Sequence, residues 1–139
     1  MRQYHTKFNI ETRGKGLYDL THEVAGWLHA CRPQVGLLTL FVRHTSASLL
    51  IQENADPDVR HDLESFLSRL VPENDPLYRH RQEGPDDMPA HVRAALTQTH
   101  LAIPVEGGRM VLGTWQGIYL FEHRRAWQRR EVAGHLLTD

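Results

Sequence analysis

Apolar and polar residues follow two different periods along this chain, and each period predicts a different kind of element. From Gln3 to Glu11 every second side chain is apolar, aromatic or threonine, the pattern of a strand with one buried face. Residues 35–42 form a continuous apolar run, typical of a strand covered on both faces. Residues 49–52 predict another short strand. Further strands are expected at 100–106, 109–112, 118–123 and 132–137, with a tight Gly107-Gly108 turn between the first two of these.

Helical spacing recurs in three other segments. The first is predicted over residues 19–31, with Asp19 or Thr21 as its cap. Its apolar positions are Leu20, Val24, Leu28 and Cys31. Asp56 and Pro57 predict a second helix, at 57–70, with a buried stripe of Val59, Leu63, Phe66, Leu67 and Leu70. A third is expected at 88–98 with Asp86 or Asp87 as its cap and Val92 and Leu96 facing inward.

Together these elements predict one α+β domain spanning residues 1–139. Its mostly antiparallel strands are expected to pack as two layers, in the manner of a β-sandwich, with about three helices. A chain of 139 residues is long enough for one sizeable core. Residues 72–85 hold three prolines and many charges, so this longest irregular segment is expected to act as a lid or a subunit contact.

Charge and cysteine content narrow the possible partners and compartment. Sixteen basic and seventeen acidic residues give a net charge of −1, which argues against nucleic-acid binding and against a polybasic membrane protein. Cys31 is the only cysteine, so no internal disulfide forms, and its place on an apolar stripe predicts a small buried hydrophobe rather than a nucleophile. The first residues lack the pattern of a signal peptide, which predicts a cytoplasmic protein.

Ten histidines are many for this length, and three of them lie at the ends of predicted elements. His44, His91 and His123 are candidate ligands of a divalent metal, zinc or magnesium. His44 is also a candidate catalytic residue, together with Glu53, Asn54 and Glu122, which are nearby catalytic or ligating groups. A three-histidine site suits zinc, whereas magnesium prefers oxygen ligands. The alternative for His44 is that it ties down a strand end.

Two further groups of residues are candidates for substrate binding. Thr45, Ser46 and Ser48 offer hydroxyl donors to phosphate oxygens, although hydroxyls at a strand break are also common turn formers. Trp115 and Gln116 lie between two glycines, where the indole can stack on an aromatic heterocycle and the amide can read its polar edge. Alternatively, Trp115 fills the core or a subunit interface.

Four segments of the chain resemble one known family. HTSAS, QENADP, EGPDDMPAH and GTWQGI, which begin at His44, Gln52, Glu83 and Gly113, occur in the order and rough spacing of the YjbQ-type proteins. Some members of that family are labelled secondary thiamine-phosphate synthase. The resemblance implies a transferase that joins a pyrimidine diphosphate to a thiazole phosphate, and a homotrimer with its sites close to the subunit interfaces.

The leading hypothesis is therefore a metal-assisted enzyme that acts on a small phosphorylated heterocyclic substrate, with an activity similar to thiamine-phosphate synthase. Histidine ligands fit zinc better than the magnesium that such a synthase would use. Two alternatives stay open: a metal-dependent hydrolase, and a non-catalytic protein that binds a small heterocycle or a metal.

Overall fold

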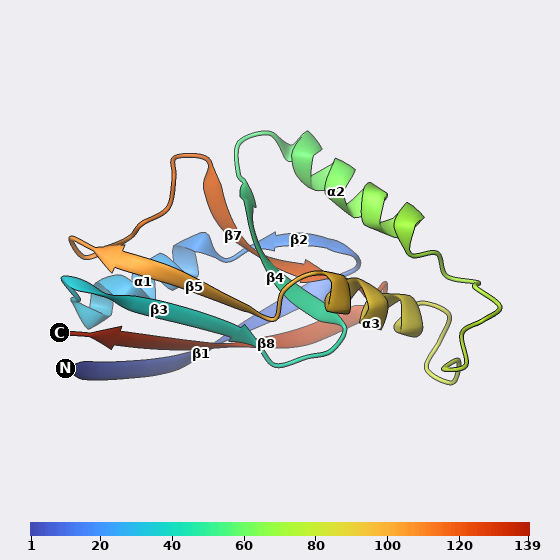
Figure 1. Ribbon diagram of the computed structural model, residues 1–139, viewed down its shortest axis with the longest axis horizontal. Coiled ribbons are helices and arrows are strands. Elements are labelled where there is room, and N and C mark those ends of the chain that lie inside the picture. Colours follow the sequence, from blue (N-terminus) through green and yellow to red (C-terminus); the bar gives the residue numbers. More distant parts are fainter.

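The computed structural model describes residues 1–139 and arranges the strands as two antiparallel sheets with three helices (Figure 1). The larger sheet has the order β1-β8-β3-β5-β6, comprising β1 (Arg2–Arg13), β8 (Trp127–Thr138), β3 (Val35–Val42), β5 (His100–Glu106) and β6 (Arg109–Met110). The smaller sheet has the order β2-β7-β4, comprising β2 (Gly16–Asp19), β7 (Gln116–Glu122) and β4 (Ala47–Glu53). The predicted α+β class, with antiparallel strands in two layers, is confirmed.

The three helices are close to their predicted positions: α1 (Thr21–Cys31), α2 (Pro57–Leu70) and α3 (Asp87–Leu96). Asp56 caps α2 as predicted, because its carboxylate accepts a hydrogen bond from the Asp58 amide. Asp19 accepts from the Thr21 amide just before α1. Asp86 precedes α3 without capping it through its side chain, since that carboxylate is used elsewhere. No helix is both long enough and apolar enough to cross a membrane.

The hydrophobic core lies between the two sheets and beneath α1. Leu38 and Leu40 of β3 face Leu49 of β4 and Leu120 of β7 within one continuous cluster of buried side chains. Cys31 belongs to that cluster, which confirms its predicted burial, and burial raises the pKa of its thiol above the ordinary value. The Gly107-Gly108 turn between β5 and β6 is also confirmed, with both residues at positive φ.

Two predicted burial patterns are wrong. The β3 run was expected to be covered on both faces, but Val35, Leu37 and Phe41 are exposed, because nothing packs on the outer face of the larger sheet. The stripe of α2 was expected to be buried, but no residue of α2 is fully buried, and Phe66 and Leu70 are each more than half exposed. Figure 1 shows the reason: α2 lies at the edge of the molecule.

Two further predictions fail in detail. In α3, Leu96 is exposed and Val92 is only half-buried. The buried residues of this helix are Asp87, Pro89, Ala90, Arg93 and Ala94, so its inner face combines small apolar side chains with two charged ones. The last strand begins at Trp127, five residues earlier than predicted, because residues 127–131 also pair with β1. Residues 72–85 contain no helix or strand, as predicted.

A buried polar clamp joins the two sheets at one end. Glu122, the last residue of β7, is fully buried and pairs with Arg130 of β8, whose Nη2 lies 2.5 Å from Glu122 Oε2. Thr12 of β1 donates to Glu122 Oε1, and Arg130 also donates to the side chain and carbonyl of Ser46. Because β7 and β8 belong to different sheets, this ion pair fixes one sheet against the other.

We expect Glu122→Ala to lower the free energy of unfolding by about 3–5 kcal/mol, since it leaves the Arg130 guanidinium buried and unpaired. The double substitution Glu122→Leu/Arg130→Met should lose much less, because both charges are then absent. Urea denaturation measures both. The control is Glu11→Ala, which breaks an exposed pair with Arg129 and should cost under about 1 kcal/mol. Equal losses for Glu122→Ala and Glu11→Ala would show that the clamp does not hold the sheets.

Candidate functional site

Two histidines converge on one buried carboxylate at the start of α3. His80 Nε2 lies 2.7 Å from Asp87 Oδ2, and His91 Nε2 lies 3.0 Å from the same oxygen. His80 comes from the irregular segment before α3, Asp87 is the first residue of the helix, and His91 follows one turn later on the same face. The three side chains form the one group of potential metal ligands in which all ligand atoms lie within 4.8 Å of one another.

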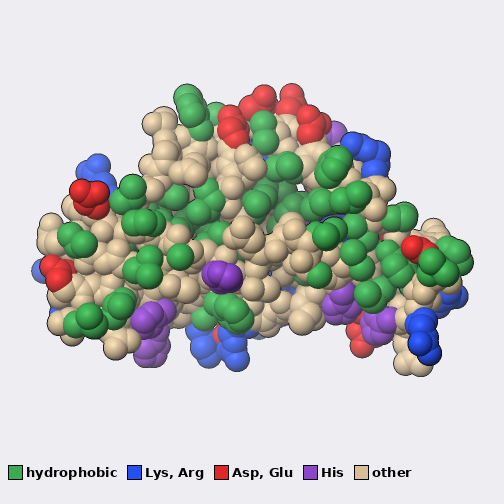
Figure 2. All heavy atoms as spheres, in the orientation of Figure 1, with side chains coloured by type: hydrophobic (Ala, Val, Ile, Leu, Met, Phe, Trp, Pro, Cys, Tyr) green, Lys and Arg blue, Asp and Glu red, His purple; other side chains and the backbone are tan.

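This cluster is open to solvent on its histidine side. The Asp87 side chain is buried, whereas about a third of the His91 side chain and more of His80 are exposed. Figure 2 shows histidine side chains at the surface near α3, beside an acidic one. A group entering from solvent can therefore reach the two imidazoles without any rearrangement of the core.

The hydrogen bond at His91 Nδ1 determines what His91 Nε2 can bind. His91 Nδ1 lies 2.9 Å from the carbonyl oxygen of Thr45, which can only accept a hydrogen bond, so Nδ1 carries the proton. In the neutral ring, Nε2 then presents a lone pair to the Asp87 carboxylate. That contact is attractive only when a proton or a cation lies between the two atoms. A backbone carbonyl behind the ring is also the usual support of a metal-binding histidine.

Arg124 holds the Asp87 carboxylate in place through Oδ1, the oxygen that does not face the histidines. Its Nη1 donates to Asp87 Oδ1, its Nε donates to Asp86 Oδ2 and its Nη2 donates to the Glu83 carbonyl. Burial alone would raise the pKa of Asp87, but the hydrogen bond from His80 and the charge of Arg124 lower it below the ordinary value. The carboxylate is therefore ionised, with Oδ1 occupied by Arg124 and Oδ2 facing the histidines.

The distances are close to those expected in the ligand shell of a small divalent ion. Zinc binds nitrogen and carboxylate oxygen at about 2.0–2.2 Å, so two tetrahedral ligands are separated by roughly 3.3 Å. The observed separations of 2.7 and 3.0 Å are slightly shorter, so a small outward shift of the imidazoles would accommodate an ion. Two nitrogens and one oxygen suit zinc better than magnesium.

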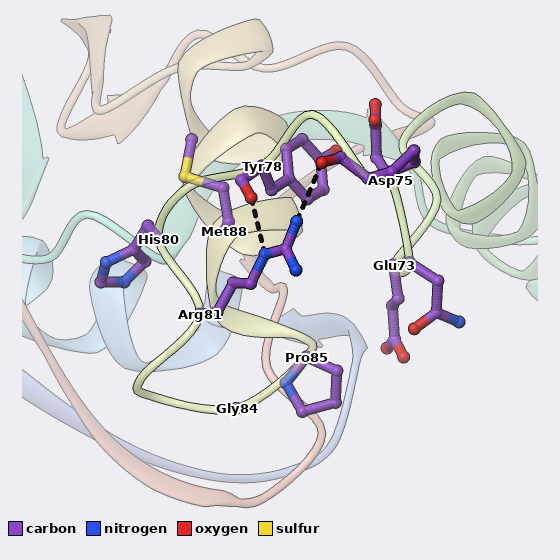
Figure 3. Close-up of a pocket in the computed structure, with 10 residues that line it drawn as sticks. Glu73, Asp75, Tyr78, His80, Arg81, Gly84, Pro85 and Met88 are labelled. Carbon is purple, nitrogen blue, oxygen red and sulfur yellow. Dashed lines mark hydrogen bonds between the residues drawn. The ribbon is translucent and has the colours of Figure 1, made fainter.

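A cavity of about 450 Å³ adjoins the cluster within residues 73–88 (Figure 3). His80 forms part of its wall, together with Tyr78, Arg81 and Met88. The Arg81 guanidinium is fixed by the carbonyls of Tyr78 and Pro76, and in Figure 3 the His80 ring points away from it. The cluster therefore borders this cavity instead of lying inside it.

The predicted three-histidine centre is not assembled within the chain. Only His91 joins the cluster. His44 Nε2 accepts a hydrogen bond from the Glu131 amide, so it ties down a strand end, which is the alternative left open for this residue. His123 is buried and its Nε2 lies 2.9 Å from the Ser48 hydroxyl, away from solvent.

The predicted catalytic and phosphate-binding residues are mostly held by structural contacts. Glu53 accepts from the amides of Ala55 and Asp56 and so shapes the entry to α2. Glu122 and Ser46 belong to the clamp with Arg130. Thr45 contributes its carbonyl oxygen to the cluster as the hydrogen-bond partner of His91 Nδ1.

The Trp115 segment lies at the other end of the smaller sheet. Trp115 is 62% exposed, and its carbonyl accepts from the Asn54 amide. The Gln116 side chain accepts from the Gly113 amide, so it closes its own turn. Because Gln116 pairs with Glu53 and Glu122 pairs with Ala47, the seven-residue strands place this segment about 20 Å from the cluster end. One chain therefore does not bring Trp115 to His91.

Sequence reasoning missed His80 and Asp87. Asp87 was read only as a helix start, and His80 lay in a segment without a periodic pattern. One signal was available: Asp87 and His91 are four residues apart on a predicted helix, which places both side chains on one face. His80 carried no such signal, because the path of an irregular segment cannot be read from periodicity.

The buried His123 ring predicts a loss of stability in acid. Burial, followed by the charges of Arg93, Arg130 and Lys15, lowers its pKa from 6.5 to about 3. Between pH 6.5 and pH 3 the His123 ring therefore binds a proton in the unfolded chain but not in the folded chain. The free energy of unfolding is accordingly highest above pH 6.5 and falls as the pH is lowered towards 3. We expect the free energy of unfolding to be about 2 kcal/mol lower at pH 5 than at pH 8 from this residue alone.

The measurement compares urea denaturation of the parent and His123→Gln at both pH values. Glutamine can keep a hydrogen bond to Ser48 but does not titrate, so this variant should lose the contribution of His123 and retain that of the other histidines. An identical pH dependence in the two proteins would show that His123 is not held neutral.

Comparison with known proteins now adds the family. Residues 6–139 match the family model described as UPF0047 protein YjbQ-like. A UPF0047 protein of Synechocystis is 51% identical over 97% of this chain and 92% of its own length. The UPF0047 protein YjbQ of Escherichia coli O157:H7 is 45% identical over 94% of this chain and 95% of its own.

Solved structures agree with this assignment. A conserved hypothetical protein of Thermus thermophilus superposes with a TM-score of 0.84 at 37% identity, covering 95% of this chain and 99% of that one. A YjbQ/UPF0047 protein of Clostridium acetobutylicum gives a TM-score of 0.87 at 30% identity, with the same coverage. Sequence and structure thus agree over nearly the whole chain, and the protein belongs to the YjbQ (UPF0047) family.

Proposed function

We propose that this protein is a metal-assisted enzyme acting on a small phosphorylated substrate, with a divalent ion, zinc by preference, held by His80, Asp87 and His91. The observation that carries the proposal is the convergence of His80 Nε2 and His91 Nε2 on Asp87 Oδ2 while the Thr45 carbonyl fixes the proton of His91 on Nδ1. That arrangement directs the lone pair of His91 Nε2, the ring nitrogen Nε2 of His80 and one anionic oxygen at the same position, where a metal ion would replace the proton that His80 donates to Asp87. A metal ion satisfies all three.

The residues around the cluster have separable roles in this proposal. A divalent ion supplies Lewis acidity, which polarises a phosphoryl oxygen and activates water. Arg124 keeps Asp87 ionised and turns its Oδ2 towards the histidines. The adjoining cavity offers space for a small molecule, and the fixed guanidinium of Arg81 offers charge for its phosphate.

The ligand set favours hydrolysis over synthesis as the reaction. Two histidines and one carboxylate with an open fourth position is the arrangement of many zinc hydrolases. Thiamine-phosphate formation would instead draw on magnesium, an ion that prefers oxygen ligands. The synthase activity remains the second candidate, supported by the family resemblance. A non-catalytic protein that binds a heterocycle or metal in the same place is the third.

Protein purified without a histidine tag should contain close to one zinc ion per chain by elemental analysis. His80→Ala and His91→Ala should each weaken zinc binding on the order of tenfold to a hundredfold or more, because each removes one ligand. His61→Ala, an exposed histidine outside the cluster, is the control and should retain full metal content. Metal content unchanged in both cluster variants would remove the centre.

Activity separates the candidate reactions. Zinc-loaded protein should hydrolyse phosphate monoesters of small heterocycles, and Asp87→Asn should lower kcat/KM by on the order of a hundredfold or more because the anionic ligand is lost. Thiamine phosphate made from its pyrimidine diphosphate and thiazole phosphate precursors, with no hydrolysis, would favour the synthase. If the protein binds zinc tightly but shows neither activity, only the non-catalytic alternative remains.

We also propose a homotrimer. It is supported by the family resemblance and by the division of the family motifs between the two ends of the smaller sheet. The exposed Trp115 segment and the His80–Asp87–His91 cluster lie at opposite ends of β4 and β7. A second copy could bring the two together. The uncovered face of β3, with Val35, Leu37 and Phe41 exposed, offers an apolar contact surface.

Light scattering should then give a mass of roughly 48 kDa, three chains of 16.1 kDa, and Phe41→Lys should reduce it towards one chain because a charge would enter the contact. His61→Lys, an exposed residue of α2 and therefore off this sheet, is the control. A parent protein that runs as a monomer would rule out the trimer, and a trimer in the Phe41→Lys variant would place the contact elsewhere.

A further inference from the structure

Helix α2 turns a row of polar side chains towards β2. Arg60, Glu64 and Ser68 are spaced four residues apart, so they share one face of the helix, and all three are partly buried. Phe66 and Leu70 lie on a different face and are each more than half exposed. A surface helix ordinarily buries its apolar stripe, so the inward position of the polar row calls for an explanation.

A cavity of about 390 Å³ lies between this polar row and the start of β2. Lys15 and Gly16 line it from the turn between β1 and β2, and Leu17 is the only hydrophobic residue in its wall. A side chain at Gly16 would meet nothing within 4 Å, so the space beside this turn is open. The volume lies within the range of about 300–1,000 Å³ that is typical of small-molecule sites, but the lining is polar.

Two cations line this cavity from different elements, and each has donors to spare. Lys15 Nζ donates to Ser68 Oγ at 2.9 Å and lies 3.7 Å from Glu64 Oε1. Arg60 Nη1 donates to Tyr119 Oη at 3.3 Å, and the guanidinium carbon lies 5.6 Å from the centroid of the Tyr119 ring. An ammonium carries three N–H donors and a guanidinium five, so most of them are available to a ligand. Because Tyr119 is buried, it holds Arg60 in position before a ligand binds.

We propose that this cavity is a second ligand site, which binds a small phosphate-type oxyanion between Lys15 and Arg60. Ammonium and guanidinium groups both bind phosphate through charge-assisted hydrogen bonds, and a guanidinium can hold two oxygens at once. Ser65 and Ser68 add hydroxyl groups from α2. None of the residues that line the cavity belongs to the His80–Asp87–His91 cluster or to the cavity beside it, so the site goes beyond the proposed metal centre.

Glu64 limits the strength of this site. Its carboxylate accepts a hydrogen bond from Ser68 Oγ and offsets part of the charge of Lys15. An oxyanion in the cavity is therefore attracted by two positive charges and repelled by one negative charge. Removing the charge of Glu64 should accordingly tighten anion binding, an effect that a purely structural role of the polar row does not produce.

A titration of isotopically labelled, metal-free protein with inorganic phosphate, followed by amide chemical shifts, measures both the place and the strength of binding. Shifts are expected in residues 14–17 and 60–68. Lys15→Met and Arg60→Met should each weaken binding on the order of tenfold, because each removes a charged donor. Glu64→Gln should tighten binding about threefold to tenfold, because the repulsive charge is lost while the amide oxygen still accepts from Ser68. Arg129→Met, an exposed arginine outside the cavity, is the control and should bind phosphate as the parent does.

The opposite signs expected for Lys15→Met and Glu64→Gln separate binding from support of the fold. If the polar row only supports the fold, both variants lower the free energy of unfolding and leave phosphate binding unchanged, and the proposal is wrong. Shifts confined to residues 73–88, or no response of the parent to phosphate, would also overturn it. His91→Ala should lose zinc yet keep the phosphate response, so a failure of the metal centre and a failure of this second site give different results.

Discussion

The ion pair between Glu122 and Arg130 is the constraint on which both the fold and the site depend. It joins the last residue of β7 to β8 and so fixes the angle between the two sheets. The same carboxylate also accepts from the amides of His123 and Arg124, which sets the turn after β7. Arg124 then reaches α3 and holds Asp87. The buried salt bridge therefore helps to position Asp87, a candidate metal ligand, through the turn that carries Arg124.

Such a pair contributes specificity more than it contributes stability. Two charges taken out of water recover their desolvation cost only when every remaining donor and acceptor is bonded, and Thr12 and Ser46 complete that set here. Arg93 is the counter-example in the same interior, because two of its donors are left open.

Periodicity predicted the elements well and their environment less well. The bounds of α2 and the turn between β5 and β6 could be read from Asp56, Pro57 and the two glycines, because caps and tight turns are local. Whether the outer face of β3 or the stripe of α2 is covered depends on neighbours distant in sequence or in another chain. The prediction of the site failed for the same reason. His44 and His123 could each ligate a metal, but the tertiary fold pairs them with Glu131 and Ser48.

In the proposed function, His80, Asp87 and His91 form one metal centre. Diffraction from zinc-soaked crystals, recorded on both sides of the zinc absorption edge, tests it most directly. The account predicts one strong anomalous peak about 2 Å from His80 Nε2, His91 Nε2 and Asp87 Oδ2, with the His91 Nδ1 contact to the Thr45 carbonyl unchanged. A peak at His44 or His123, or no peak at the cluster at saturating zinc, would contradict it.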